Sequence, residues 1–307
     1  MKLNMHECLD EDYRRIRDFL REIFLLNGKR ELSWQSYRFD YWRWHGLENL
    51  EHRKLSETVF IWETADEQIM AVLNPEGKGN AVFQVHPVHR TPELEEKMLL
   101  LAEDRLSTLN DEGQRKLRVW AHEEDDLRKG LLRRRGYIKS DFHEYQRRRP
   151  LSKPIPDMTA KKGYTVRALG GVEELPSRSY ASWTSFHPDE PDDYYEGWEW
   201  YLNVQRAPLY RQDLDIVAVD ENNEIASFCT VWFDDETGTG AFEPVGTAKS
   251  HQKRGLAKAV IYEGLRRLKK LGATMAHVGS YEPRTHSLYA SIGFTEYDVC
   301  ESWVKEW

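Results

Sequence analysis

Apolar residues recur with two different periods in residues 164–307, and the change of period marks the expected elements. Short apolar runs separated by polar or glycine-containing turns are typical of paired strands, and these runs are 215–220, 225–233 and 241–247. After them the apolar positions recur at helical spacing, at Leu256, Val260, Gly264, Leu268 and Leu271. The pattern predicts three strands followed by a helix, which Gly272 ends.

A loop that we call the cofactor loop, Gln252-Lys253-Arg254-Gly255-Leu256-Ala257, lies between the third expected strand and this helix. Gly255 allows a ligand to approach the backbone closely, and the positive end of the helix favours an anion. The loop is therefore expected to hold the pyrophosphate of a carrier with its main chain. A P-loop would need Gly-Lys-Ser/Thr and a dinucleotide-binding fold Gly-x-Gly-x-x-Gly, and the loop has neither.

The cofactor loop resembles that of the GNAT superfamily of acyl-CoA-dependent N-acyltransferases, Gln/Arg-x-x-Gly-x-Gly/Ala, at Gln252, Gly255 and Ala257. Residues 288–294, Leu-Tyr-Ala-Ser-Ile-Gly-Phe, resemble the second signature of that family, Leu-Tyr-x-x-x-Gly-Phe. The resemblance implies an α/β (α+β) fold with a mixed, mostly antiparallel sheet flanked by helices, acetyl-CoA as acyl donor, and no metal. The cofactor-binding residues that it implies are Val245, Gly246, Thr247, Gln252, Lys253, Arg254, Gly255, Leu256 and Ala257.

The first half of the chain repeats the second at a shift of 157 residues. Gly136-Tyr137 then falls on Gly293-Phe294, and His86-Pro87-Val88 falls on Glu243-Pro244-Val245. An expected helix at 93–109 overlays the helix after Gly255. We therefore expect two tandem GNAT-like domains, with a first domain at 1–150, a proline-rich linker at 151–163 and a second domain at 164–307.

The two halves are not equivalent. At the same shift Gln252, Gly255 and Ala257 correspond to Glu95, Met98 and Leu100, and Tyr289 corresponds to Leu132. An acidic side chain repels a pyrophosphate, and bulky side chains block its approach to the backbone. The first domain is thus expected to be a non-catalytic scaffold that has lost the cofactor.

Acyl transfer to an amine needs a base, a polarised thioester carbonyl and a proton for the thiolate. Glu243 is the candidate general base, and Pro244 beside it should make the strand bulge, leaving Val245 and Thr247 free to bind the pantetheine arm. The resemblance places Tyr289 at the CoA sulfur as the acid, and a phenol with a pKa near 10 stays protonated at neutral pH. The alternatives are a solvent-facing Glu243, a merely buried Tyr289, and His251 as the base.

One departure from the family pattern concerns the helix at 283–292. Glu282 stands where the family often has an Asn that contacts the cofactor, and Thr285 replaces a small residue. A hydroxyl contact from Ser287 is a further alternative on this helix.

The acceptor is expected to be a primary amine of a small molecule or peptide. Residues 182–201 combine carboxylates with aromatic rings, which suits a cation, although helix capping and inward packing explain each residue singly. The similar aromatic run 34–44 places Tyr37, Tyr41 and Trp44 on one helical face, which favours packing.

Composition excludes several other classes of protein. The formal net charge of −8 and the pI near 5.8 argue against nucleic-acid or anionic-membrane binding. No apolar leader or membrane-length run is seen, so a cytoplasmic protein is expected. The three cysteines, Cys8, Cys229 and Cys300, lack metal-ligand spacing and should be reduced. The arginine triplets 133–135 and 147–149 are expected on a solvated face.

The sequence thus predicts an N-acetyltransferase that moves an acetyl group from acetyl-CoA to an amine by direct attack. Tandem relatives of the family include mycothiol synthases, but nothing in the sequence selects their substrate. The alternatives are a non-catalytic acyl-CoA-binding regulatory protein and a purely structural pair of domains. The sequence does not predict an oligomeric state.

Overall fold

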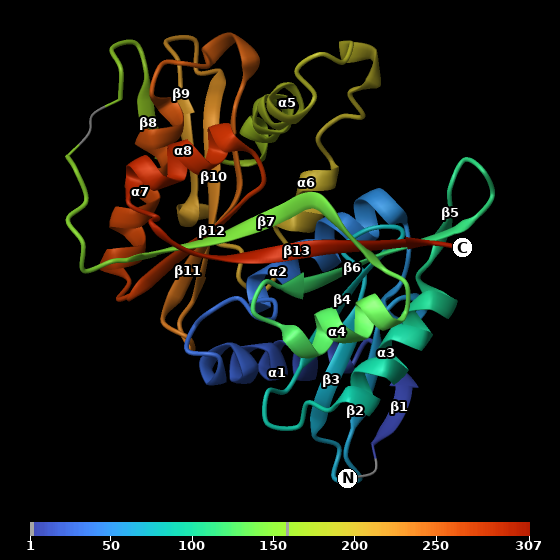
Figure 1. Ribbon diagram of the computed structural model, residues 1–307. Helices are drawn as coiled ribbons and strands as arrows, with labels where there is room; N and C mark the ends of the chain where they lie inside the picture. The colour runs from blue at the N-terminus through green and yellow to red at the C-terminus, as the bar shows by residue number, and fades with distance from the viewer. Residues whose placement is uncertain (1–2, 158–159) are drawn as a thin grey trace. The chain divides into compact units, whose positions relative to one another are not determined.

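The computed structural model describes residues 3–157 and 160–307 (Figure 1). The chain forms two compact units, of which unit 1 comprises Met1–Gln146 with Asp298–Trp307 and unit 2 comprises Arg147–Tyr297. The chain enters unit 2 at Arg147 and returns to unit 1 at Asp298. Two long strands make these connections: β7 (Ile138–Pro150) runs from unit 1 into unit 2, and β13 (Glu296–Glu306) runs from unit 2 back into unit 1. Residues 158 and 159 of the expected linker 151–163 lie outside the described residues.

Unit 1 is built on a mixed sheet with the strand order β1-β2-β3-β4-β6-β13. Its helices are α1 (Asp12–Leu26), α2 (Ser36–Tyr41), a π-helical segment (Trp42–Glu51), α3 (Pro92–Arg105) and α4 (Asp126–Arg134). The other strands are β1 (Asn4–Glu7), β2 (Phe60–Glu63), β3 (Ile69–Asn74), β4 (Asn80–Val85), β5 (Thr108–Leu109) and β6 (Arg115–His122). All neighbouring strands are antiparallel except β4 and β6, which are parallel.

Successive residues of the central strands of unit 1 face two different hydrophobic cores, because strand side chains alternate between faces. Phe60 and Leu73 pack with α3 and α4, whereas Ile61 and Val72 pack with α1 and the aromatic run that follows it. Trp34, Phe39 and Trp42 of that run are buried. The expected packing role of the run is thus confirmed. The buried face is a different one from the expected face of Tyr37, Tyr41 and Trp44, because only Tyr37 of these three is buried.

Unit 2 has the strand order β7-β12-β11-β10-β9-β8. Its strands besides β7 are β8 (Thr165–Ala168), β9 (Asp215–Val219), β10 (Ile225–Asp234), β11 (Thr239–Thr247) and β12 (Met275–Ser280). Its helices are α5 (Leu175–Phe186), α6 (Trp200–Val204), α7 (Leu256–Lys270) and α8 (Pro283–Ile292). Apolar side chains of α7 and α8 form one core with β9 to β12, and α5 carries no member of this core.

The predicted strands and the helix after Gly255 are confirmed to within two residues at each end. The expected helix 93–109 ends earlier, at Arg105, and residues 108–109 pair with β6 instead. The expectation for the triplet 147–149 is wrong in part: Arg147 and Arg149 are buried and donate to the main-chain oxygens of Phe294 and Ile292. A charge run can be buried when backbone acceptors satisfy it, which composition alone does not reveal.

No helix in the described ranges 3–157 and 160–307 is long and apolar enough to cross a membrane. The same part of the chain contains no group of three or more His, Cys, Asp or Glu side chains that could hold a metal ion. Cys8, Cys229 and Cys300 are free thiols.

Candidate active site

Strand β11 of unit 2 carries a β-bulge at the proposed base. Cys229 of β10 pairs with Val245 and Val231 pairs with Phe242, so Thr230 alone faces both Glu243 and Pro244. An extra residue on one strand bends that strand and disrupts the hydrogen-bond ladder. The bulge expected from Pro244 is confirmed.

Beyond this bulge, β11 and β12 no longer pair. Their parallel ladder joins Thr239–Ala241 to Met275–His277 and ends there, although β11 continues to Thr247 and β12 to Ser280. Main-chain groups must find hydrogen-bond partners somewhere. The splayed strand ends therefore leave a place where an extended ligand can bond to the main chain of β11.

Among the predicted cofactor residues of β11, Val245 and Thr247 are half-buried and Gly246 is buried. A Cβ atom on Gly246 would lie 2.3 Å from the ring of Phe228 and 3.0 Å from Ser185 of α5. Gly246 thus allows α5 to pack closely on β11. Its lack of a side chain has a packing reason that the sequence did not suggest.

The structure brings the two proposed catalytic side chains into electrostatic reach of each other. Tyr289 is 6% exposed and lies in the core against Phe294. Burial raises the pKa of the Tyr289 phenol above its ordinary value, and the charges of Cys229 and Glu243 raise it further. Tyr289 therefore stays protonated at neutral pH, and Glu243 on the bulge is near enough to influence it.

The cofactor loop has a backbone shaped by two left-handed residues. Lys253 has a φ of 60° and Gly255 a φ of 79°, and Gly255 is the N-cap of α7. No side chain within the described ranges caps this helix. The amide groups at the start of a helix lack intrahelical partners, so the loop and the first turn of α7 offer amide donors to an anion.

Gln252 holds the cofactor loop to its neighbours through both ends of its amide. Its nitrogen donates to the Thr247 main-chain oxygen at 3.3 Å, and its oxygen accepts from Arg284 of α8 at 3.0 Å. The motif residue thus acts at least partly as a brace between the end of β11 and α8. Arg284 was not singled out from the sequence, and its position in the first turn of α8 was the only signal.

The other loop residues differ in exposure. Lys253 and Arg254 are exposed, Ala257 is half-buried, and Leu256 is buried in the core. Arg254 donates to the hydroxyl of Tyr164 and to the Ser250 main-chain oxygen. These two cations lie beside the free helix start, where they would add to the attraction of a pyrophosphate.

His251, the alternative base, is engaged elsewhere. Its Nδ1 lies 2.8 Å from the Tyr164 hydroxyl, and the two rings meet edge to face. Tyr164 therefore ties His251 and Arg254 together at the outer side of the loop. This role of Tyr164 carries no sequence signal, because the partners are about 90 residues apart.

The segment after α5 folds around aromatic contacts. Trp183 stacks on His187 with ring centroids 4.2 Å apart, and it also contacts Tyr195 at 6.2 Å. Asp189 pairs with Lys249, which lies three residues before the cofactor loop, at 2.9 Å. The acidic segment is therefore tied to the cofactor side of unit 2 through an exposed ion pair.

Helix α5 also takes part in a buried polar network. Arg178 of α5 is fully buried, with Nε 3.5 Å from Asp215 and Nη2 donating to Thr230 at 3.2 Å. Its guanidinium lies 3.7 Å from the centre of the Phe228 ring, and Tyr201 donates to Asp215. Thr230 is the residue that faces the bulge, so the network fixes α5 and β9 behind the proposed base. Sequence reasoning missed it, although an arginine inside the α5 pattern was a signal.

In unit 1 the corresponding opening is filled by the protein itself. Strands β4 and β6 pair only at Asn80–Ala81 and Arg118–Val119. Beyond that point the guanidinium of Arg128 donates to the main-chain oxygens of Trp120 at 3.3 Å and Phe83 at 3.5 Å. Glu95 of α3 pairs with Arg128 at 2.9 Å and also with Arg90.

The contacts of Glu95 differ from those expected when its charge was taken to repel a pyrophosphate in unit 1. Glu95 lies inside the first turn of α3 and is fully buried, whereas Gln252 precedes α7. The charge of Glu95 is neutralised by Arg128 and Arg90, so repulsion between Glu95 and a pyrophosphate does not explain why unit 1 lacks the loop. Instead α3 begins directly at Pro92 with Thr91 as its cap, and the loop has no counterpart.

Residues 173–294 match the family described as "Acetyltransferase (GNAT) family". The matched range contains the bulge, the splayed strands, the cofactor loop and Tyr289. This part of unit 2 is therefore similar to the GNAT superfamily. The resemblance inferred from the two motifs is thus confirmed.

Two proteins with similar sequences are mycothiol acetyltransferases. The protein from Thermomonospora curvata is 28% identical over 201 residues, which cover 63% of this chain and 65% of that protein. The protein from Pseudarthrobacter chlorophenolicus is 23% identical over 251 residues, which cover 75% and 71%. The chain thus spans slightly less than two thirds of the length of the first relative.

Solved structures resemble this chain over nearly its whole length. A GCN5-related N-acetyltransferase from Sphaerobacter thermophilus matches with a TM-score of 0.68 at 16% identity, covering 99% of this chain and 95% of that one. A tandem GNAT protein from the clavulanic acid biosynthesis pathway matches with a TM-score of 0.69 at 13% identity, covering 99% and 98%. This likeness concerns the fold, and it confirms the predicted tandem architecture.

Proposed function

We propose that unit 2 transfers an acetyl group from acetyl-CoA to a primary amine by direct attack, and that unit 1 does not take part in the chemistry. The observation that carries this proposal is the uncapped start of α7 at Gly255, next to the open ends of β11 and β12. The first feature suits a pyrophosphate and the second an extended pantetheine arm. The GNAT family uses acetyl-CoA as its donor.

In this proposal the residues of unit 2 divide the proton transfers between them. Glu243 takes a proton from the ammonium group of the acceptor, directly or through water, so that the nitrogen lone pair can attack the thioester carbon. A main-chain N–H of β11 at Val245 holds the carbonyl oxygen as charge develops there. When the C–S bond breaks, Tyr289 donates its proton to the departing thiolate.

We propose a small-molecule amine, or an amine of a peptide, as the acceptor. Support comes from the carboxylates and aromatic rings of 182–201, which suit a cation, and from the names of the two mycothiol acetyltransferase relatives.

The test is CoA release measured with a panel of amines, for the wild type and for Glu243→Gln. Removing a general base lowers kcat by roughly 100-fold to 10,000-fold, whereas CoA affinity measured by calorimetry should not change. Glu263→Gln on α7, far along the helix from its start, is the matched control and should retain full turnover.

Three outcomes distinguish the alternatives. Turnover that Glu243→Gln abolishes with CoA binding intact supports the enzyme. Tight binding of acetyl-CoA without turnover of any amine supports a regulatory acyl-CoA-binding protein. If calorimetry detects no acetyl-CoA binding at all, both readings fail and the chain is a structural pair of GNAT-like units.

A further inference from the structure

The bulged stretch of β11 is bonded to a tryptophan of the neighbouring strand. The indole Nε1 of Trp232 on β10 donates to the main-chain oxygen of Glu243 at 2.5 Å. The tryptophan side chain is 1% exposed, so its N–H is removed from water and needs an acceptor within the protein. The bond joins a buried side chain directly to the backbone of the proposed base.

The side chain of Trp232 lies on the face of the sheet that α5 covers. Successive strand residues alternate between faces, and Cys229 and Val231 of β10 belong to the core that α7 forms on the other face. Thr230 bonds to Arg178 of α5 instead. Trp232 is two residues further along and continues the row of Thr230. It therefore reaches the bulge from the side of α5.

The ring of Trp232 is packed against the buried polar network of unit 2. It meets the Tyr210 ring edge to face, with the ring centroids 6.4 Å apart. Tyr210 donates to Asp215 at 3.1 Å, and Asp215 also pairs with the buried Arg178. A side chain whose rotamer is fixed by packing holds its bonding partner in one geometry. The Arg178 network thus reaches the main chain of Glu243 through Trp232.

The bulge explains why a side-chain donor matters at this point of β11. Glu243 and Pro244 share one partner residue on β10, so the regular ladder is interrupted there. Pro244 carries no N–H, which leaves the strand fewer bonds with which to keep its course. The bond from Trp232 holds the backbone where the ladder does not, and the direction of the Glu243 side chain follows from its backbone.

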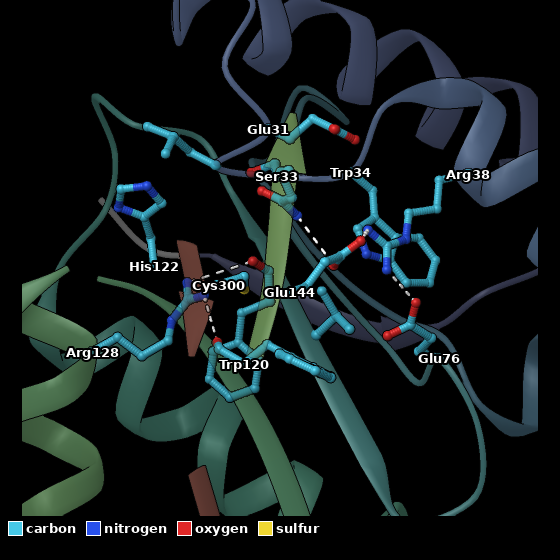
Figure 2. Close-up of a pocket in the computed structure, with 14 residues that line it drawn as sticks. Glu31, Ser33, Trp34, Arg38, Glu76, Trp120, His122, Arg128, Glu144 and Cys300 are labelled. Atoms are coloured by element: carbon cyan, nitrogen blue, oxygen red, sulfur yellow. Dashed lines mark hydrogen bonds and ion pairs between the residues drawn. The ribbon is translucent and has the colours of Figure 1, made fainter. Parts of the chain in front are cut away.

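Unit 1 holds its corresponding strands in another way. Strands β3 and β4 pair in a continuous register, whereas the register of β10 and β11 shifts at the bulge. A side-chain donor to β4 is Arg128, which lies at the wall of a small cavity and bonds to the main-chain oxygens of Phe83 and Trp120 (Figure 2). A side chain thus bonds to a strand oxygen in both units, but in unit 2 that oxygen belongs to the proposed base.

We propose that Trp232 is a positioning residue of the acetyl transfer, whose N–H fixes the bulge so that the Glu243 carboxylate meets the ammonium group of the acceptor. This role rests on the proposed function, in which Glu243 is the base. Trp232 acts through the main chain of Glu243 and not on the substrates. Displacing a reacting group by about 1 Å can cost about 100-fold in rate, so a single bond to its backbone has a large effect.

The test compares the wild type with Trp232→Phe in the CoA-release assay, with an amine of the panel that the wild type acetylates. Phenylalanine keeps an aromatic ring and removes the N–H, so kcat should fall roughly tenfold to 100-fold. CoA affinity, measured by calorimetry, should stay unchanged. Trp303→Phe, which removes the same atoms from a buried tryptophan of unit 1, is the matched control and should keep full turnover.

Glu243→Gln provides a readout that a purely structural tryptophan would not change. If Trp232 acts by placing the carboxylate, Trp232→Phe should lower turnover by less than about twofold once that carboxylate is gone. The pH profile provides another readout. The loss in Trp232→Phe should shrink as the pH rises through the pKa of the acceptor amine, because a neutral amine needs no base. A tryptophan that only supports the fold would cost the same turnover in both backgrounds and at every pH.

A second variant separates the lost N–H from lost packing, since the smaller ring of phenylalanine leaves a space. Benzothienylalanine in place of Trp232 keeps the fused ring system and exchanges the N–H for a sulfur atom. It should lose as much kcat as Trp232→Phe. Full turnover with this analogue would overturn the positioning role even if Trp232→Phe does not fold.

The remaining outcomes distinguish a failure of this role from a failure of the proposed function. If Glu243→Gln lowers turnover and both Trp232 variants retain it, the base stands and the positioning role is wrong. An equal loss in the Glu243→Gln background would make Trp232 a packing residue. If Glu243→Gln has no effect, or if no amine is acetylated, the proposed function fails and the role of Trp232 fails with it.

Discussion

Two pairs of parallel strands splay apart in this molecule, and the two openings are satisfied in different ways. Between β11 and β12 of unit 2, the ladder ends after Ala241 and the strand ends stay open. Between β4 and β6 of unit 1, Arg128 donates to a main-chain oxygen on each strand. Exposed main-chain groups need partners: in unit 1 a protein side chain supplies them, and we propose that in unit 2 a ligand does.

The helices that follow the two openings begin differently as well. Helix α3 begins with Thr91 accepting from the Leu94 amide and with Pro92 at its first position, where a missing N–H does no harm. Helix α7 has Gly255, in the left-handed conformation, as its N-cap residue, and it has no side-chain cap. At the start of α3 the Thr91 side chain accepts a hydrogen bond from a main-chain amide. At the start of α7 no side chain accepts from the first amides, so they can donate to an anion.

The largest effect among the substitutions that test this comparison is expected from Glu95→Gln, which should destabilise unit 1. The substitution removes the Glu95 carboxylate from the buried guanidinium of Arg128, which keeps the more distant Asp125 at 3.8 Å, and breaking such a pair costs about 3–5 kcal/mol. The free energy of unfolding of unit 1, measured by denaturant titration and hydrogen exchange of α3, should fall by that amount. The variant carries the glutamine of the cofactor motif, but calorimetry should detect no second CoA site, because α3 has no loop in front of it.

The pH dependence provides the control for Glu95→Gln. Burial disfavours the charge of Glu95, but Arg128 and Arg90 outweigh it and lower the pKa of the carboxyl below its ordinary value of 4.5. The stabilisation is therefore present above pH 4.5 and is lost as the pH falls through the lower folded pKa. The wild type should lose stability in this acidic range and Glu95→Gln should lose less. Identical pH profiles would contradict the assigned role of the pair.

The second largest effect is expected from Gly255→Val in the cofactor loop. A β-branched residue at a φ of 79° is strained, and the substitution should either distort the loop or block the approach of a phosphate to the backbone. We expect a loss of CoA affinity of about 100-fold, which corresponds to about 2.7 kcal/mol. Isothermal titration calorimetry with CoA measures it.

Gly272→Val is the matched control, because Gly272 has a φ of 91° and open space around it at the other end of α7. Both variants should lose about 1–3 kcal/mol of stability through backbone strain. Only Gly255→Val should lose CoA affinity. Equal affinities in the two variants would exclude the cofactor loop as the phosphate site.

Much of this comparison could be predicted from the sequence, and the reason lies in local patterns. The apolar period and Gly272 predicted α7, and Pro244 predicted the bulge at Glu243, because each depends on neighbours along the chain. The role of Glu95 could not be predicted, since its partner Arg128 lies 33 residues away. The alignment of the two halves at a constant shift of 157 residues also predicted a loop at Glu95 in unit 1, where the chain instead forms the first turn of α3.

The buried arginines illustrate the same limit. Arg147 and Arg149 look like a solvated run, but their partners are main-chain oxygens of residues more than 140 positions further along the chain. The Arg178 network likewise joins α5 to β9 and β10. Partners that only the tertiary fold brings together leave no periodic signal in the sequence.

A smaller effect is expected from Tyr289→Phe, which keeps the buried ring and removes the proposed acid. Because the hydroxyl is protonated at neutral pH, its loss should lower kcat about tenfold to 100-fold, with CoA affinity unchanged. The effect should decrease when the leaving thiolate needs less help, as with an acyl donor that carries a thiol of lower pKa. An unchanged kcat would make Tyr289 a packing residue only.

The smallest effect is expected from Thr91→Ala at the start of α3. Loss of an N-cap costs about 1 kcal/mol, which denaturant titration of unit 1 can resolve, and Thr91→Ser should retain most of the stability because its hydroxyl can still accept from Leu94. The amide that Thr91→Ala releases lies in front of a buried, neutralised Glu95 and not in a loop. CoA should therefore stabilise the variant and the wild type equally. If CoA instead restored the lost stability of unit 1, the uncapped α3 would bind phosphate. The Thr91 hydroxyl alone would then explain why α3 binds no phosphate in the wild type.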